Sequence, residues 1–133
     1  MPPYNGAMTY EQARQYLLDL PDAFLDYPFG AEVAVFKVRN KIFATLTETN
    51  GKVFSNLKCD PEEALMLRDL FDEVMPGYHM NKKHWNTLEL AGNLPRIEIQ
   101  RMMENSYTLV VKNLPKKARQ SLEIEYGADN IYR

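Results

Sequence analysis

The stretch VAVFKVRNKIFATLTETNGKVFSNLK, residues 33–58, decides the fold of this chain. It holds three runs rich in β-branched and aromatic residues, at 33–38, 42–47 and 53–58, joined by very short connections. Asn50-Gly51 is a strong hairpin signal, because both central residues of a type I′ turn need a positive φ. We expect Asn40-Lys41 to form the other tight turn. The stretch therefore predicts an antiparallel meander.

Helix signals flank this meander on both sides. Thr9 and Gln12 form a capping-box pattern that predicts a helix over 10–19, and Pro21 stops it. Asp60-Pro61-Glu62-Glu63 opens a second helix, with a capping carboxylate followed by proline at the first helical position. Two further helices are expected over 95–114 and 115–126, the second ending at Gly127.

Together these signals predict an α+β fold. We expect an antiparallel meander sheet of five to six strands, including a short strand over 24–29, with N-terminal, middle and two C-terminal helices packed on it. Residues 9–127 form a single domain in this interpretation. Residues 1–8 are expected to be a flexible leader and residues 128–133 a tail.

Net charge, cysteine count and hydropathy exclude several classes of protein. The chain has 133 residues and a formal net charge of −2, which argues against a protein that coats nucleic acid by bulk charge. Cys59 is the only cysteine, so no internal disulfide can form, and we expect this thiol to be a small buried hydrophobe. No apolar run approaches the ~18 residues of a membrane helix. We expect a cytoplasmic monomer with no membrane partner.

The densest group of polar, aromatic and cationic side chains is PGYHMNKKHWNT at 76–87. We interpret 78–80 and 84–90 as two extended arms, with Asn81, Lys82 and Lys83 at the tip. The tip is either a solvated turn whose lysines discourage edge-to-edge association or a contact surface. Tyr78 and Trp85 are either core anchors or, with His79, part of a pocket. The two histidines and one distant cysteine do not complete a zinc site, so we predict neither metal nor cofactor.

A second basic group lies at the expected start of the last helix. Lys116, Lys117 and Arg119 fall within its first turn or so, where the helix dipole disfavours cations. A bound anion would compensate for this placement, and the alternative is a solvated basic turn. Residues 82–119 hold eight basic and three acidic residues, so this part of the chain is positive while the rest is acidic.

Several of these segments resemble the signature segments of the MmcQ/YjbR family. They are Tyr27-Pro28-Phe29-Gly30, Val35-Phe36-Lys37-Val38, Leu57-Lys58-Cys59-Asp60-Pro61-Glu62, residues 76–87, Ser106-Tyr107 and Leu114-Pro115-Lys116-Lys117-Ala118-Arg119. The resemblance implies a CyaY-like fold, with an antiparallel sheet and helices on one face in a double-wing arrangement. It also implies DNA binding.

Two classes of function follow. The first is a DNA-binding protein in which Lys82, Lys83, Lys116, Lys117 and Arg119 contact phosphates, while Asn81 and His84 add hydrogen bonds. The second is a non-enzymatic binding module for a small anionic ligand or a protein partner, with a pocket at Tyr78, His79 and Trp85. The sequence holds no nucleophile elbow, phosphate loop or metal set, so we do not expect an enzyme.

Overall fold

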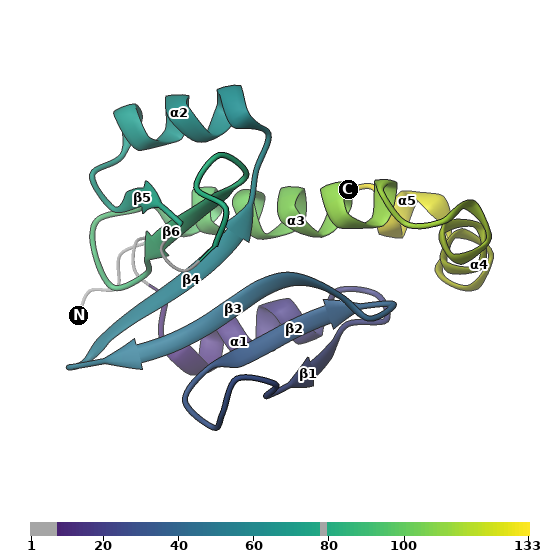
Figure 1. Cartoon of the computed structure of the whole chain (residues 1–133), viewed down its shortest axis with the longest axis horizontal. Coiled ribbons are helices and arrows are strands. Elements are labelled where there is room, and N and C mark those ends of the chain that lie inside the picture. The colour runs from purple at the N-terminus through teal and green to yellow at the C-terminus, as the bar shows by residue number, and fades with distance from the viewer. Residues whose placement is uncertain (1–7, 78–79) are drawn as a thin grey trace.

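The computed structural model describes residues 8–77 and 80–133. Their strands form one six-stranded antiparallel sheet (Figure 1). The strands are β1 (Phe24–Asp26), β2 (Ala34–Val38), β3 (Lys41–Thr49), β4 (Lys52–Lys58), β5 (Val74–Pro76) and β6 (Trp85–Glu89). Their spatial order is β1-β2-β3-β4-β6-β5, so the first four form the predicted meander and β6 lies between β4 and β5. The predicted fold class is confirmed.

The two tight turns of the meander both use positive φ. Asn50 (φ 54°) and Gly51 (φ 78°) join β3 to β4, as predicted. The turn between β2 and β3 is formed by Arg39 (φ 48°) and Asn40 (φ 66°), because Lys41 already belongs to β3. The prediction of Asn40-Lys41 was therefore wrong by one residue.

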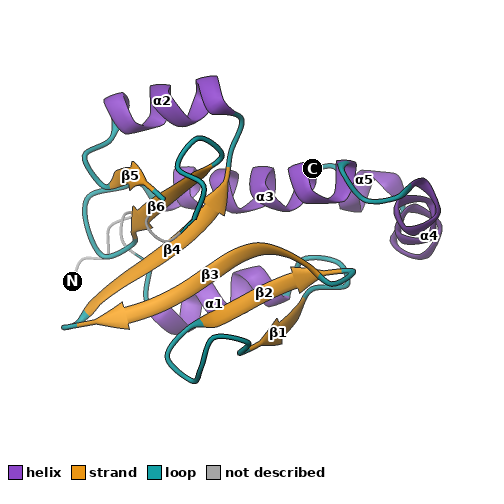
Figure 2. Cartoon of the chain, in the orientation of Figure 1, coloured by secondary structure: helices purple, strands orange, loops and turns teal. Residues whose placement is uncertain are grey.

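Five helices complete the described chain (Figure 2). They are α1 (Tyr10–Leu18), α2 (Pro61–Leu70), α3 (Arg96–Lys112), α4 (Lys116–Tyr126) and α5 (Ala128–Ile131). Thr9 and Gln12 form the predicted capping box of α1, and Asp60 caps α2 by accepting from the Glu63 N–H. The helical predictions hold to within a few residues at each end.

The described residues at both ends of the chain are more ordered than the predicted leader and tail. The predicted tail instead continues into α5, because Ile131 packs into the core and keeps only 1% of its surface exposed. Met8, which we placed in the leader, is buried as well, and its N–H donates to the Leu90 carbonyl at 2.8 Å. The predicted strand over 24–29 ends at Asp26, and a turn follows in which the Gly30 N–H donates to the Tyr27 carbonyl at 3.2 Å.

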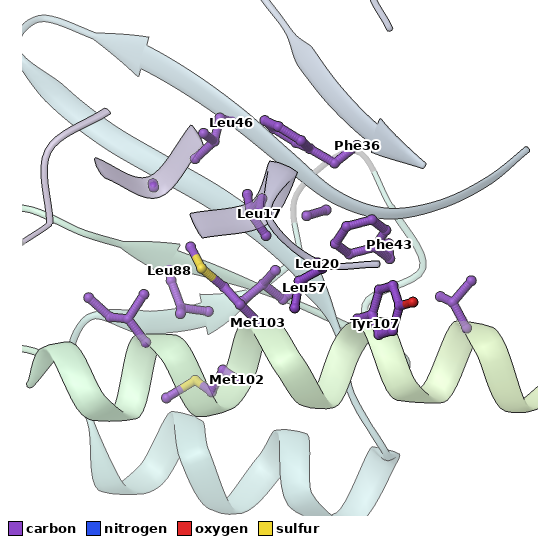
Figure 3. Packing of buried hydrophobic residues seen from close by; sticks show 14 of the residues in the cluster. Leu17, Leu20, Phe36, Phe43, Leu46, Leu57, Leu88, Met102, Met103 and Tyr107 are labelled. Atoms are coloured by element: carbon purple, nitrogen blue, oxygen red, sulfur yellow. The ribbon is translucent and has the colours of Figure 1, made fainter. Parts of the chain in front are cut away.

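The core lies between one face of the sheet and the helices α1 and α3. Figure 1 shows both helices behind β2, β3 and β4, so that the face of these strands toward the viewer carries no helix. In Figure 3, Tyr107 of α3 lies beside Phe43 of β3, with ring centroids 5.4 Å apart and planes at 89°. α2 packs against β5 and β6, so it covers the other end of the sheet.

Ser106 of α3 joins the sheet where β3 and β4 stop pairing. The register between β2 and β3 shifts beside Phe43, and the paired residues of β3 and β4 end at Ala44 and Leu57. Beyond this point, the Lys58 N–H donates to Ser106 Oγ at 2.7 Å, and the Ser106 hydroxyl donates to the Phe43 carbonyl at 2.6 Å. One side-chain hydroxyl therefore takes the place of a missing ladder hydrogen bond.

Replacing Ser106 with alanine should destabilise the fold by about 2–4 kcal/mol, because a buried N–H and a buried carbonyl both lose their partner. Urea unfolding followed by circular dichroism would measure the change. Ser121→Ala is the matched control, since Ser121 is exposed and its hydroxyl only accepts from Arg39 at 3.3 Å. Equal stability of the two variants would contradict the assigned role of Ser106.

Candidate functional site

The basic motif closes a hairpin whose first arm begins earlier than predicted. Pro76 of β5 pairs with Asn86 of β6, and the Gly77 N–H donates to the Trp85 carbonyl at 2.8 Å. Of the predicted arm over 78–80, residues 78 and 79 lie outside the described part of the chain, and the residues that pair with β6 are Val74–Pro76. Pro76 can pair there since β5 is the edge strand, where a missing N–H is tolerated.

Gly77 lies where the chain beyond β5 passes close to Trp85 of β6. A Cβ at this position would lie 2.8 Å from Trp85 Cβ and 2.8 Å from the Trp85 carbonyl oxygen. Only glycine allows the two strands to approach so closely at this point. Trp85 itself is 9% exposed, which agrees with the anchor alternative for this side chain. Tyr78 and His79, the other members of the predicted pocket, lie outside the described residues.

Residues 80–84, here called the basic loop, are held by hydrogen bonds within the loop and to a neighbouring strand. Asn81 Oδ1 accepts from the Lys83 N–H at 2.9 Å, and the Asn81 carbonyl accepts from the His84 N–H at 3.1 Å. The His84 carbonyl accepts from the Cys59 N–H at 2.8 Å, just beyond β4. Asn81, Lys82 and Lys83 are exposed and His84 is half-buried. The side chain of Asn81 thus helps to shape the turn.

Arg68 of α2 fixes the basic loop from the other side. Its guanidinium donates to Asn86 Oδ1 at 2.7 Å, to the Trp85 carbonyl at 3.4 Å and to the Lys82 carbonyl. The planar fork of arginine suits such a set of acceptors. Sequence reasoning missed Arg68, although it lies four residues after the buried Ala64 and therefore faces the sheet.

The second basic group is remote from the first. Lys116 and Lys117 are exposed in the first turn of α4, and Arg119 is half-buried. No side chain caps this helix start among the residues described. Figure 1 shows α4 at the opposite end of the molecule from α2, β5 and β6. The structure therefore does not bring Lys116, Lys117 and Arg119 together with the basic loop.

A groove of about 610 Å³ lies over the helix-free face of the sheet, and sequence reasoning missed it. Its lining residues come from four strands and two loops and carry no charge: Phe29, Val33, Ile42, Thr45, Thr47, Phe54, Asn56, Met75, Met80 and Thr87. The sequence signal that could have revealed this face is the two-residue period of the strand over 52–58, which places Phe54 and Asn56 on the face opposite to Val53, Ser55 and Leu57. Met80 makes the basic loop one border of this groove.

Cys59 is buried, as predicted. Burial, together with the Glu63 carboxylate 3.7 Å from Sγ, raises the pKa of the thiol to about 12, so the group stays protonated at neutral pH. Within residues 8–77 and 80–133, no three His, Cys, Asp or Glu side chains are grouped so that they could hold a metal ion. None of the described helices is both long enough and apolar enough to span a membrane.

Arg68→Ala should loosen the basic loop, because Asn86 Oδ1 and the Lys82 carbonyl lose the Arg68 donor and the Trp85 carbonyl keeps only the Gly77 N–H. We expect amide hydrogen exchange at residues 81–85 to accelerate at least tenfold and the free energy of unfolding to fall by about 1–3 kcal/mol. Hydrogen exchange followed by mass spectrometry would measure this. Arg14→Ala is the control, since Arg14 forms only a 3.4 Å ion pair with Glu11 on the surface of α1. Unchanged exchange in the loop would show that Arg68 does not hold it.

Comparisons with known proteins agree with this fold. The YjbR family model matches residues 18–109. The uncharacterized protein YbdF of Escherichia coli O157:H7 is 38% identical over 108 residues, which cover 81% of this chain and 88% of that protein. The uncharacterized protein YjbR of Escherichia coli K12 is 33% identical over 115 residues, covering 86% of this chain and 98% of that protein.

Solved structures show the same similarity. The crystal structure of Deinococcus radiodurans protein DR2400, with a DUF419 domain, has a TM-score of 0.81 and 34% sequence identity and covers 87% of this chain and 88% of that chain. A crystal structure of a Pseudomonas syringae protein has a TM-score of 0.69 and 32% identity and covers 77% of this chain and 98% of that chain. Family match, sequence identity and fold therefore agree, and the chain belongs to the YjbR family.

Proposed function

We propose that this protein is a non-enzymatic nucleic-acid-binding protein whose basic loop contacts the phosphate backbone. The observation that carries the proposal is the fixed, exposed position of Lys82 and Lys83. Arg68 and Asn81 hold the main chain of the loop by hydrogen bonds, so little loop entropy is lost when the two lysines meet a ligand. Both lysines are exposed residues of a surface loop.

The chemistry of the loop suits phosphate positioning. Lysine ammonium groups attract phosphates through a sequence-independent, salt-dependent interaction. The half-buried His84 and the amide nitrogen of Asn81 add hydrogen-bond donors beside the lysines. With a net charge of −2, the whole protein adds no long-range attraction, so binding depends on this local patch.

The start of α4 is proposed as a separate, weaker contact. Lys116, Lys117 and Arg119 lie at the far end of the molecule from the basic loop (Figure 1), so one short site cannot use both groups. The uncapped N–H groups at this helix start favour an anion by about 0.3–1 kcal/mol where they are exposed. This is less than two direct lysine contacts supply.

Neutralising the basic loop should remove most of the salt dependence of binding. For Lys82→Gln/Lys83→Gln, we expect the slope of log K against log salt to become shallower by about 1.4–1.8 units, since each phosphate contact contributes about 0.7–0.9. Fluorescence anisotropy with a labelled single strand and a labelled duplex, at several salt concentrations, measures the slope. Lys116→Gln/Lys117→Gln is the matched control, because it removes the same charge from the other end of the molecule.

Two results would contradict the proposal. If the unmodified protein binds neither nucleic acid at low salt, nucleic-acid binding is wrong for this chain. If both lysine pairs change the slope equally, binding is general charge attraction and the basic loop is no site. A screen of small phosphorylated compounds by thermal shift would then test the alternative, a module for small anionic ligands.

A further inference from the structure

The groove on the helix-free face has the size of a small-molecule site. Its volume of about 610 Å³ lies within the ~300–1,000 Å³ that such sites occupy. It lies over the middle of the sheet, with β3, β4, β5 and β6 all contributing side chains. No described helix covers it in Figure 1. Side chains of the sheet therefore form most of the groove, and the loop residues Phe29, Val33 and Met80 complete its lining.

Three polar residues cross the floor of the groove in one row. Thr45, Asn56 and Thr87 are direct partners on β3, β4 and β6. The Asn56 main-chain N–H donates to Thr45 Oγ1 at 3.2 Å, and the Thr87 hydroxyl donates to Asn56 Oδ1. The contact with Thr87 orients the side-chain amide of Asn56. No described residue accepts a hydrogen bond from Asn56 Nδ2, so this amide nitrogen remains as a donor for a ligand.

The walls of the groove are apolar and can hold a flat ring. Phe29 is 68% exposed and Phe54 is half-buried, so both rings keep surface that a ligand could stack on. Met75 and Met80 add flexible thioethers that pack well against aromatic rings. None of the ten lining residues is charged. These features select an uncharged, flat ligand whose edge carries a hydrogen-bond acceptor.

The charged residues around the groove are unevenly distributed between its two ends. Met80 borders the groove, and the exposed Lys82 and Lys83 follow two and three residues later in the same loop. On the other side of Phe54, Glu89 pairs with Lys52 at 4.0 Å, so that end is close to neutral. An uncharged ring in the groove, joined to negative charge at the basic loop, matches this distribution.

An unpaired nucleobase with its phosphates has this chemistry. We propose that the groove binds an unpaired base of single-stranded nucleic acid, while Lys82 and Lys83 contact the neighbouring phosphates. This inference rests on the proposed function and names its substrate. A duplex keeps its bases stacked and paired, so it offers phosphates to the basic loop but no ring to the groove.

The test compares a labelled oligothymidylate with a labelled duplex of the same length by fluorescence anisotropy. Phe29→Ala removes one stacking surface and should weaken single-strand binding roughly tenfold, since stacking on an aromatic side chain contributes at about this level. Asn56→Asp keeps the acceptor for Thr87, removes the amide donor and adds a negative charge, and it should weaken single-strand binding at least as much. Phe29→Ala should change neither duplex binding nor the slope against salt, and Asn56→Asp, which adds a charge, should weaken duplex binding less than single-strand binding.

Phe24→Ala is the matched control, because Phe24 is 39% exposed on β1 and does not line the groove. Thermal unfolding of Phe29→Ala, Asn56→Asp and Phe24→Ala shows whether each variant retains the fold. Unchanged single-strand affinity in Phe29→Ala and Asn56→Asp would overturn the base site while leaving phosphate binding intact. If the unmodified protein binds neither strand nor duplex, the proposed function fails, and the base site fails with it.

Discussion

The hydroxyl of Ser106 is the interaction on which the rest of this structure depends. It accepts from the Lys58 N–H and donates to the Phe43 carbonyl, so a helix side chain completes the hydrogen bonding of the sheet. Tyr107 follows it in the chain and packs edge-on against Phe43 (Figure 3). α3 is therefore fixed to the point where β3 and β4 separate. A buried hydrogen bond of this kind specifies position, because any shift leaves polar groups unpaired.

The residues that follow Lys58 connect the core to the basic loop. One residue after Lys58, the Cys59 N–H binds the His84 carbonyl, and the next residue, Asp60, caps α2. α2 in turn supplies Arg68, whose guanidinium holds the other side of the loop. The loop that carries the exposed lysines is thus linked to the core through hydrogen bonds and short stretches of main chain. This explains how a surface loop can be fixed without a disulfide or a metal.

Local signals predicted much of the fold, and tertiary contacts explain the errors. Asn50-Gly51 and the Asp60 cap depend on neighbouring residues alone, so the sequence reveals them. Arg39 takes a positive φ where its guanidinium lies 3.3 Å from the Asp22 carboxylate and 3.7 Å from that of Glu125. Neither partner is near it in the chain. Ile131 likewise forms part of the core only because the whole fold is present.

The candidate site also contains some residues that could be predicted from the sequence and others that could not. Lys82 and Lys83 could be found by residue type, because charge on a turn is visible in the sequence. Asn56 could not, since its environment comes from Thr45 and Thr87, which are 11 and 31 residues away. The period of β4 places Val53, Ser55 and Leu57 toward the helices and Phe54 and Asn56 on the other face. The core is thus built on one face of β4, and Phe54 and Asn56 on the helix-free face are not part of it.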